Sequence, residues 1–268
     1  MTPQRILFLR IAPTNYLIAC LLLWAAFSHI SYAAAPSTAA AGRAAARLQT
    51  VIPACDPITT DTVWTTGNIY VLQNCNLTIV ADASLTIQPG VIVKFWGTAP
   101  GYGSALGSAA AIVDGTLNAI GAAGQPIVFT SYADDAHGGD TNGDGASSGA
   151  AGDWYGLVFR AGSVGHLEHF FVGYAGSGVF NATLGYGRGQ VDVRQAEMEL
   201  RHGTVTAGRQ KGIYLEGAGI TPIIDDVRLA DNRAADGRGS AIYQHTINMQ
   251  PAYSNLVFAS NDRDETTI

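Results

Sequence analysis

Basic residues and long apolar runs are scarce in this sequence, and each shortage excludes a class of protein. The 268-residue chain has 15 Lys and Arg against 21 Asp and Glu, which gives a formal net charge of −6. Because its arginines are scattered, the chain offers no basic stripe for nucleic acid. Its most apolar run, Leu17–Phe27, is too short for a comfortable membrane span, and no later segment approaches one. The sequence therefore indicates neither a nucleic-acid-binding protein nor a mature chain that spans a membrane.

The N-terminal segment has the features of a secretory signal peptide. Arg5 and Arg10 precede the apolar run Leu17–Phe27, and small residues suited to cleavage follow it. We therefore expect a signal peptide at residues 1–35 and a flexible, Ala-rich leader at 36–54. Cleavage would remove two arginines and no acid, which lowers the net charge from −6 to about −8. The expected destination is the extracellular space or the cell surface.

Cysteine is rare, and its placement agrees with export. Cys20 would leave with the signal peptide, so that Cys55 and Cys75 remain in a compartment that permits disulfides. A bridge that closes a loop of about 20 residues would contribute roughly 3 kcal/mol of stability in the chain-entropy picture. The alternative is that two thiols merely remain free. We predict a Cys55–Cys75 disulfide that fastens the N-terminal end of the domain.

Beyond Trp64 the chain consists of short β-type runs with no helical period of useful length. Gly, Asn, Asp and Pro, which reverse or bend a chain, separate these runs. The pattern predicts an all-β protein. In the first half the expected strands are Ile69–Leu72, Leu77–Val80, Leu85–Ile87, Val91–Phe95, Ala111–Val113, Leu117–Ile120 and Ile127–Thr130.

The second half of the chain repeats itself. Met198, Val227 and Leu256 each open an alternating triplet and are equally spaced, and the same interval separates Ile213 from Ile242. Similarity at a period of roughly 20–50 residues is typical of solenoids, propellers and arrays. The strands are short, no helices alternate with them, and no blade signature is present. A parallel β-helix, a solenoid in which each coil stacks on its own copy, fits best.

Two further details support stacked coils. The runs Val227–Asn232 and Leu256–Asn261 end in the same Asn-terminated turn. Val191 precedes Ile213 by a shorter interval than the one between Ile213 and Ile242, so that loop lengths vary while strands recur. Side chains that alternate along each strand would then line one buried core. The predicted inner stripe consists of Val191, Val193, Met198, Leu200, Ile213, Leu215, Val227, Leu229, Ile242, Leu256 and Phe258.

Four runs resemble secreted and surface bacterial proteins of the right-handed parallel β-helix, or pectin-lyase-like, class: Leu85–Phe95, Gly115–Ser131, Asp134–Gly145 and Gly152–Phe159. The resemblance covers roughly the chain from Asp61 onward, and it implies a single-stranded right-handed parallel β-helix and export. We expect this β-helix to occupy residues 55–268. It does not fix an activity, because this fold hosts many functions.

The loop between Ile127–Ser131 and Tyr155–Arg160 carries carboxylates with the spacing of metal ligands. Asp140-x-Asn142-x-Asp144-Gly matches the opening of a calcium loop, in which alternate side chains converge on one ion. A solvated Asp-rich turn is the alternative. We predict one weakly bound Ca²⁺ here. The candidate ligands are Asp134, Asp135, Asp140, Asn142, Asp144 and Asp153.

The sequence gives little support to catalysis, and we assign no catalytic residue. Asp225 and Asp226 are adjacent in a strand and would point to opposite faces. The Gly-His-Gly and Asp-His motifs that the resemblance implies for polysaccharide-cleaving members are missing; Arg201-His202-Gly203 comes nearest to the first. A carbohydrate-active enzyme, a polysaccharide lyase or glycoside hydrolase, therefore remains the alternative to a non-enzymatic module.

Outward positions of the repeated strands form the predicted binding surface. If Val191, Ile213 and Ile242 point inward, their neighbours point outward. Stacked tyrosines with polar groups beside them could hold the face of a sugar, although an exposed aromatic ladder that stabilises neighbouring coils would look the same. We predict a module that binds a glycan or a partner protein on its lateral face. The candidate ligand-binding residues are Asp192, Arg194, Tyr214, Glu216, Tyr243 and His245.

The C-terminal coil is expected to expose a strand edge. Leu256–Phe258 belongs to a full repeat, Thr266–Ile268 starts another, and the charged run Asp262–Glu265 lies between them. Solenoids need a polar cap at such an end. We expect a chain cut short and end-to-end self-association. Protection of the edge by the charged run and a covering second chain are the alternatives.

Overall fold

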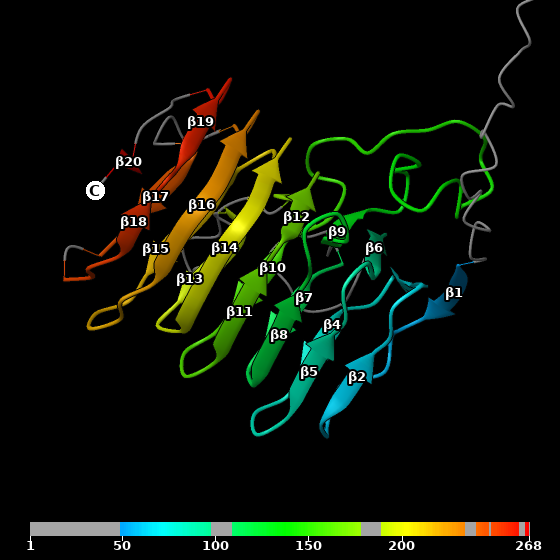
Figure 1. Cartoon of the computed structure of the whole chain (residues 1–268), viewed down its shortest axis with the longest axis horizontal. Helices are drawn as coiled ribbons and strands as arrows, with labels where there is room; N and C mark the ends of the chain where they lie inside the picture. Colours follow the sequence, from blue (N-terminus) through cyan, green and yellow to red (C-terminus); the bar gives the residue numbers. More distant parts are fainter. Residues whose placement is uncertain are drawn as a thin grey trace, which may run out of the picture. The chain divides into compact units, whose positions relative to one another are not determined.

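The computed structural model describes residues 49–97, 109–177, 189–233, 240–246, 248–262 and 266–267. Contacts divide the chain into two units, Met1–Ala46 and Arg47–Ile268, and the described residues all belong to the second. The predicted signal peptide at 1–35 lies outside the described residues. The second unit is all-β in its described part, and its strands pair in parallel in sheets of 13 and 7 strands (Figure 1). The all-β prediction is confirmed.

The strands form three stacks, here named A, B and C, and the chain visits B, A and C in turn. Stack A comprises β1 (Thr50–Pro53), β3 (Asn68–Gln73), β6 (Ile92–Trp96), β9 (Ile127–Ser131), β12 (Phe170–Gly173), the second halves of β14 (Glu197–Thr206) and β16 (Ile223–Ala230), and β19 (Val257–Ala259). Stack B comprises β2 (Thr62–Trp64), β5 (Ser84–Ile87), β8 (Thr116–Ile120), β11 (Val164–Glu168), the first halves of β14 and β16, and β18 (Ala252–Ser254). Stack C comprises β4 (Leu77–Ile79), β7 (Ala111–Val113), β10 (Leu157–Phe159), β13 (Gly189–Arg194), β15 (Lys211–Glu216), β17 (Ile242–Gln244) and β20 (Thr266–Thr267).

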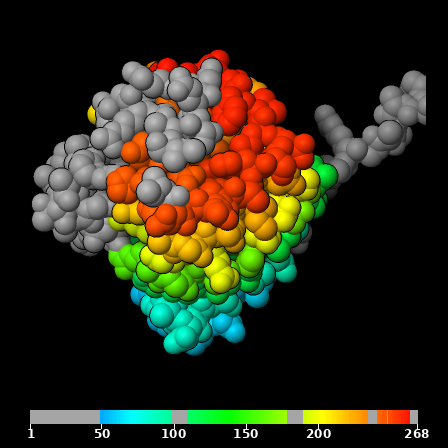
Figure 2. All heavy atoms as spheres, turned by 90° about the vertical axis from the view of Figure 1, so that its left-hand side faces the viewer, coloured from blue at the N-terminus to red at the C-terminus, as the bar shows by residue number. Residues whose placement is uncertain are grey.

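This succession is solenoid-like. In Figure 1 the strands of stack B lie side by side from β2 to β18, and Figure 2 shows the chain colours as successive bands from cyan to red. Strand β1 lies inside 36–54, the range predicted as a flexible leader, so the sheet begins before residue 55. The described residues include no helix with the length and hydropathy needed to cross a membrane.

Inward side chains of the three stacks fill one apolar core, as predicted. Nine of the eleven residues of the predicted inner stripe are buried, and Leu256 and Phe258 are partly buried against the same core. Each fully buried aliphatic side chain contributes roughly 1.5–3 kcal/mol relative to an exposed one. Short strands with few hydrogen bonds are therefore held mainly by this continuous core.

The predicted repeat register is correct in two places and wrong in one. Ile213 pairs with Ile242, and Arg228 pairs with Val257 at the same interval along the chain. Val227, however, pairs with Gly203 and not with Met198. Met198 lies instead in the first half of β14, in stack B. The triplets that begin at Met198 and Val227 thus belong to different stacks. Their spacing equals the true repeat only because the coil from Gly203 to Val227 is shorter than the coil that follows it.

A buried amide ladder joins the last coils and explains the repeated Asn-terminated turns. Asn232 donates through Nδ2 to Val205 O and to Asn261 Oδ1, both at 3.0 Å, and accepts from Gln190 Nε2 at 2.6 Å. Asn261 in turn donates to Leu229 O at 2.8 Å. Buried amides are tolerated when their donors and acceptors are paired. The ladder satisfies backbone carbonyls where the coils turn.

The connection from stack B to stack A is several residues long in the first coils and a single residue with left-handed backbone in the later ones. His169, His202 and Asp226 hold this position with φ of 45°, 51° and 52°, and Asn255 follows with 53°. Asn, Asp and His are the non-glycine residues most often found there. The rings of His169 and His202 stack at 4.9 Å, so that the corner residues contact each other from coil to coil.

Candidate functional site

The Asp-rich segment between β9 and β10 folds over the outer face of stack A. Ile69, Val71, Ile92 and Val128 form a small apolar cluster there, separate from the main core. Gly138 lies directly above it with φ of +80°, and a Cβ at this position would come within 2.7 Å of Ile69 Cδ1. Only glycine allows both this backbone conformation and this close approach. The loop therefore has a fixed seat on the sheet.

Lys94 anchors the loop from below. Its side chain points outward from β6 yet is fully buried. Its Nζ donates to Asp134 O, Gly139 O and Thr141 Oγ1, each at 2.9 Å. Burial lowers the pKa of this ammonium, while the charges of Asp134, Asp135 and Asp140 act in the opposite direction. Because its three N–H groups have three acceptors, Lys94 is held as an ammonium and supplies a positive charge beneath the acidic cluster.

Two of the six predicted metal ligands are engaged in holding the loop. Asp134 is buried, and its Oδ2 accepts from Thr130 Oγ1 at 2.5 Å and lies 2.6 Å from His137 Nδ1. Burial alone would raise the pKa of Asp134, but these hydrogen bonds outweigh it and the pKa is lowered. Asp153 Oδ2 accepts from Ser131 Oγ and from Ala150 N. These carboxylates fix the two ends of the loop.

Three other predicted ligands converge. Asp135, Asp140 and Asp144 each offer one carboxylate oxygen, and these oxygens lie within 4.8 Å of one another. Asp140 accepts from Gly143 N at 2.6 Å and Gly145 N at 3.1 Å, which closes the turn. Asn142 Nδ2 donates to Asp144 Oδ2 at 2.8 Å. This is an exposed triad of hard oxygen donors, the donor type that Ca²⁺ prefers.

Asp135 differs from the other two members of the triad. Its Oδ2 accepts from Ser147 N at 2.7 Å, whereas its Oδ1 is buried and has no hydrogen-bond partner in the protein. A buried, unpartnered carboxylate oxygen is costly unless a cation or another donor satisfies it. The arrangement can accommodate a divalent ion at this oxygen.

The six predicted ligand-binding residues are brought together on stack C, but the expected exposure is wrong for three of them. Asp192 and Tyr214 have no exposed area, and Tyr243 is 8% exposed. The outer neighbours Ile112 and Val158 are buried as well, so stack C is covered on both faces. Strand alternation predicts the direction of a side chain but does not reveal what lies over it.

Inside this covered face the six residues form a connected polar cluster. The rings of Tyr214 and Tyr243 stack at 5.8 Å, and Tyr214 OH donates to Glu216 Oε2 at 3.0 Å. Arg194 Nε donates to Asp192 Oδ1 at 3.0 Å; burial lowers the pKa of Arg194, but the bond to Asp192 outweighs it and the pKa is raised. Only the rim is open: the side chains of Glu216 and His245 are 39% and 42% exposed.

An exposed ion-paired surface that the sequence did not predict lies on the outer face of stack B. Glu199 Oε2 is 3.8 Å from His166 Nδ1 and 3.7 Å from Arg201 Nε. Arg201 Nη1 reaches Asp225 Oδ2 at 3.4 Å. Hydrogen bonds from Ser254 and Asn255 lower the pKa of Asp225, which stays ionised. Strand alternation in β11, β14 and β16 places these groups side by side on successive coils.

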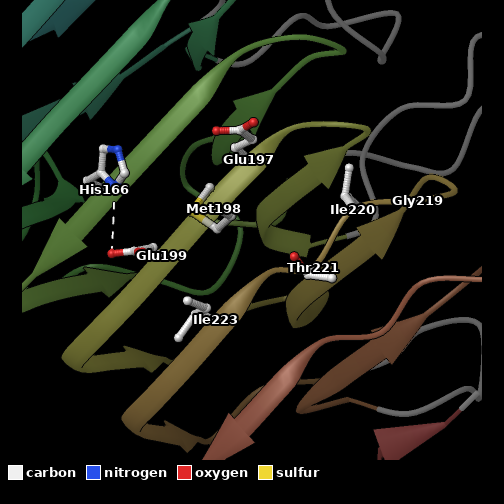
Figure 3. A pocket seen from close by; sticks show the side chains of 8 residues that line it. All are labelled: His166, Glu197, Met198, Glu199, Gly219, Ile220, Thr221 and Ile223. Carbon is white, nitrogen blue, oxygen red and sulfur yellow. Dashed lines mark ion pairs between the residues drawn. The ribbon is translucent and has the colours of Figure 1, made fainter.

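A hollow of about 280 Å³ opens on this surface. His166 comes from β11, Glu197 and Glu199 from β14, and Ile220 and Thr221 from the turn before β16 (Figure 3). The hollow thus combines carboxylate and imidazole groups with an apolar wall. Carboxylates accept hydrogen bonds from hydroxyl groups, and an apolar wall covers carbon atoms. The signal in the sequence was the alternation in Val164–Glu168 and Glu197–Arg201.

The nearest match to a catalytic motif lies at the corner beside this surface. His202 Nδ1 is 2.8 Å from Asp226 Oδ2, and this contact raises the pKa of the exposed imidazole. Asp225 belongs to the Arg201 pair, whereas Asp226 is the left-handed corner residue, and both side chains reach solvent. The prediction that the two aspartates point to opposite faces of a strand is therefore wrong. Comparison with protein-family models, curated proteins and solved structures finds no match to this chain.

Proposed function

We propose that this protein is an extracellular, non-enzymatic module that binds a glycan on its lateral face. We also propose that its fold is a right-handed parallel β-helix of the pectin-lyase-like class. The signal-like N-terminus and the Cys55–Cys75 disulfide support export, since disulfides persist in oxidising compartments. The observation that carries the proposal is the hollow on stack B, where hydrogen-bonding groups and an apolar wall meet on the solenoid face. We therefore assign the binding surface to stack B, and not to stack C as the sequence predicted, because stack C is covered.

A carbohydrate-active enzyme is the second candidate, and one observation favours it. Glu199 and Asp225 flank Arg201 within 3.4–3.7 Å on the same face, and glycoside hydrolysis uses a pair of carboxyl groups. Glu199 and Asp225 are, however, already ion-paired with Arg201 in the free protein, which favours a binding surface over a catalytic one.

Screening on a glycan array, with turnover assays on every glycan that binds, separates the two candidates. Thr221→Arg, which fills the hollow, and Glu199→Gln, which removes a charged acceptor, are expected to weaken binding about tenfold or more. Val63→Ala, an exposed residue of β2, is the control and should bind as the wild type does.

The two candidates give different results. Binding without release of new reducing ends or unsaturated products supports the module; turnover that Glu199→Gln abolishes supports the enzyme. If both hollow variants bind as tightly as the wild type, the hollow is not the site and the proposal fails.

We further propose that the loop between β9 and β10 is ordered by one calcium ion. Asp135, Asp140 and Asp144 supply the charged ligands, and Asn142 contributes its amide oxygen. The buried and unpartnered Asp135 Oδ1 supports this assignment. Since Lys94 already places a positive charge beneath the cluster, the affinity is expected to be weak, on the order of 10⁻⁴–10⁻³ M.

Calorimetric titration of calcium into chelator-treated protein tests the ion site. We expect one equivalent to bind and to raise the melting temperature, because a ligand that binds only the folded state stabilises it. The double variant Asp140→Asn/Asp144→Asn should lose both effects, whereas Asp56→Asn, an exposed aspartate after β1, should retain them. Absence of heat and of any melting shift at millimolar calcium would rule out the site.

A further inference from the structure

Trp96 is exposed in a way that the other tryptophans of the described residues are not. It is 45% exposed at the outer end of β6, whereas Trp64 is 5% exposed and Trp154 is fully buried. A solvent-facing indole gains nothing from the core, so that its large apolar face is available to a ligand. The question is what the surrounding groups would select.

Two neighbours in stack A frame the indole. Gln73 is in register with Trp96 on one side and is exposed. Tyr132, which follows β9, lies on the other side: the ring centroids are 6.4 Å apart and the ring planes are tilted by 49°. The two aromatic rings and the amide therefore occupy the same end of three successive strands, β3, β6 and β9.

The phenol ring is held in place by the acidic loop. Tyr132 OH donates to Thr141 O at 2.9 Å, and Thr141 lies between Asp140 and Asn142. The loop is itself fixed by Lys94, which bonds Thr141 Oγ1. A ring fixed before binding loses little conformational freedom when a ligand arrives, which favours affinity.

We propose that Trp96, Tyr132 and Gln73 form a second binding site, specific for a neutral sugar ring. A pyranose has a face of C–H groups and an edge of hydroxyl groups. The tilted indole and phenol match the apolar face, and the Gln73 amide can donate to and accept from hydroxyls at the edge. None of these three side chains is charged, so they offer no ion pair to the carboxylate of an anionic sugar. While the loop holds no calcium, the exposed carboxylates of Asp140 and Asp144 also repel such a sugar. This site lies on stack A, apart from the hollow on stack B, and goes beyond the proposed function.

Acrylamide quenching of tryptophan fluorescence reports this site selectively, because Trp64 and Trp154 are buried and Trp24 lies in the predicted signal peptide. The probes are hexamers of β-1,4-glucose, β-1,3-glucose, xylose, mannose and N-acetylglucosamine, with oligogalacturonate as the anionic comparison and a leucine-rich peptide as the apolar one. We expect at least one neutral hexamer to protect Trp96 from acrylamide, and neither comparison probe to do so.

Affinity measured by calorimetry with the protecting hexamer then tests the residues. Trp96→Ala should weaken binding about tenfold, and Gln73→Ala about threefold. Ile120→Ala, which changes a residue of similar exposure on stack B, should leave this binding unchanged.

Four results would overturn the proposal: no protection by any neutral hexamer, equal protection by oligogalacturonate, protection by the peptide alone, or unchanged affinity of Trp96→Ala. An effect of Glu199→Gln without an effect of Trp96→Ala would place the sugar in the hollow instead.

Discussion

Replacing Trp154 by alanine is expected to lower the free energy of unfolding by about 3–5 kcal/mol. The indole is fully buried and stacks on Phe95, with ring centroids 4.1 Å apart and planes within 4°. Its Nε1 donates to Gly173 O at 2.8 Å, so truncation leaves both a cavity and an unpaired carbonyl. Trp154 also ends the long loop, and its loss should loosen the return of the chain to β10. Urea unfolding of the purified protein, followed by circular dichroism, measures the change.

Trp154→Phe separates the two contributions. It keeps a ring against Phe95 but cannot bond Gly173 O, and a typical buried hydrogen bond contributes only about 0.5–1.5 kcal/mol. We expect a loss clearly smaller than that of the alanine variant. Equal losses in the two variants would mean that the hydrogen bond, and not the packing, holds this loop end.

Reduction of the Cys55–Cys75 disulfide is expected to cost about 3 kcal/mol of stability. The predicted bridge is present, with a Cα–Cα distance of 5.6 Å and a sequence separation of 20 residues. Cys55 follows β1, which among the described residues pairs with β3 alone, and Cys75 follows β3 itself. Without the bridge, Ile52 and Ala54 still pack against the core, but both are only partly buried, and Val51 is 47% exposed. Urea midpoints with and without reductant, together with hydrogen exchange of the β1 amides, measure the effect.

The double variant Cys55→Ala/Cys75→Ala provides the control. Its stability should match that of the reduced wild type, and reductant should not change it further. Identical midpoints for oxidised and reduced wild-type protein would show that β1 is held by other contacts and that the bridge is dispensable.

The core of this fold could be predicted from the sequence because stacked coils repeat both residue type and direction. The alternation in the sequence predicts that Ile213 and Leu215 point into the core, and both are fully buried in the structure. The registry of Met198 could not be obtained in this way. Gly203, not Met198, is the partner of Val227. Because the coil between Gly203 and Val227 is shorter than the next coil, the spacing from Met198 to Val227 equals the spacing from Val227 to Leu256 only by coincidence.

The candidate sites were harder to predict, and Tyr214 shows why. The alternation of side chains along the strand predicted that Tyr214 points outward from the core. Its burial, however, depends on groups that are remote in the sequence. A hint was present in stack C, where Ile112 and Val158 occupy outward positions, as in strands buried on both faces. Asp134 illustrates a second limit. It was a candidate ligand because it precedes the Asp140–Asp144 motif, and only the hydrogen bonds with Thr130 and His137 reveal its structural role.

The unequal coil lengths bear on how such a molecule can change. Val164 pairs with Thr116 in the coil before it and with Glu197 in the coil after it. The chain between Thr116 and Val164 is much longer than the chain between Val164 and Glu197, yet the register on both sides is intact. At the one-residue corners of His202 and Asp226, by contrast, an added residue would break a strand pair on each side. The largest variation in length thus falls in the connections that leave stack A. New recognition segments can therefore be inserted into these connections while the register of the strands is kept.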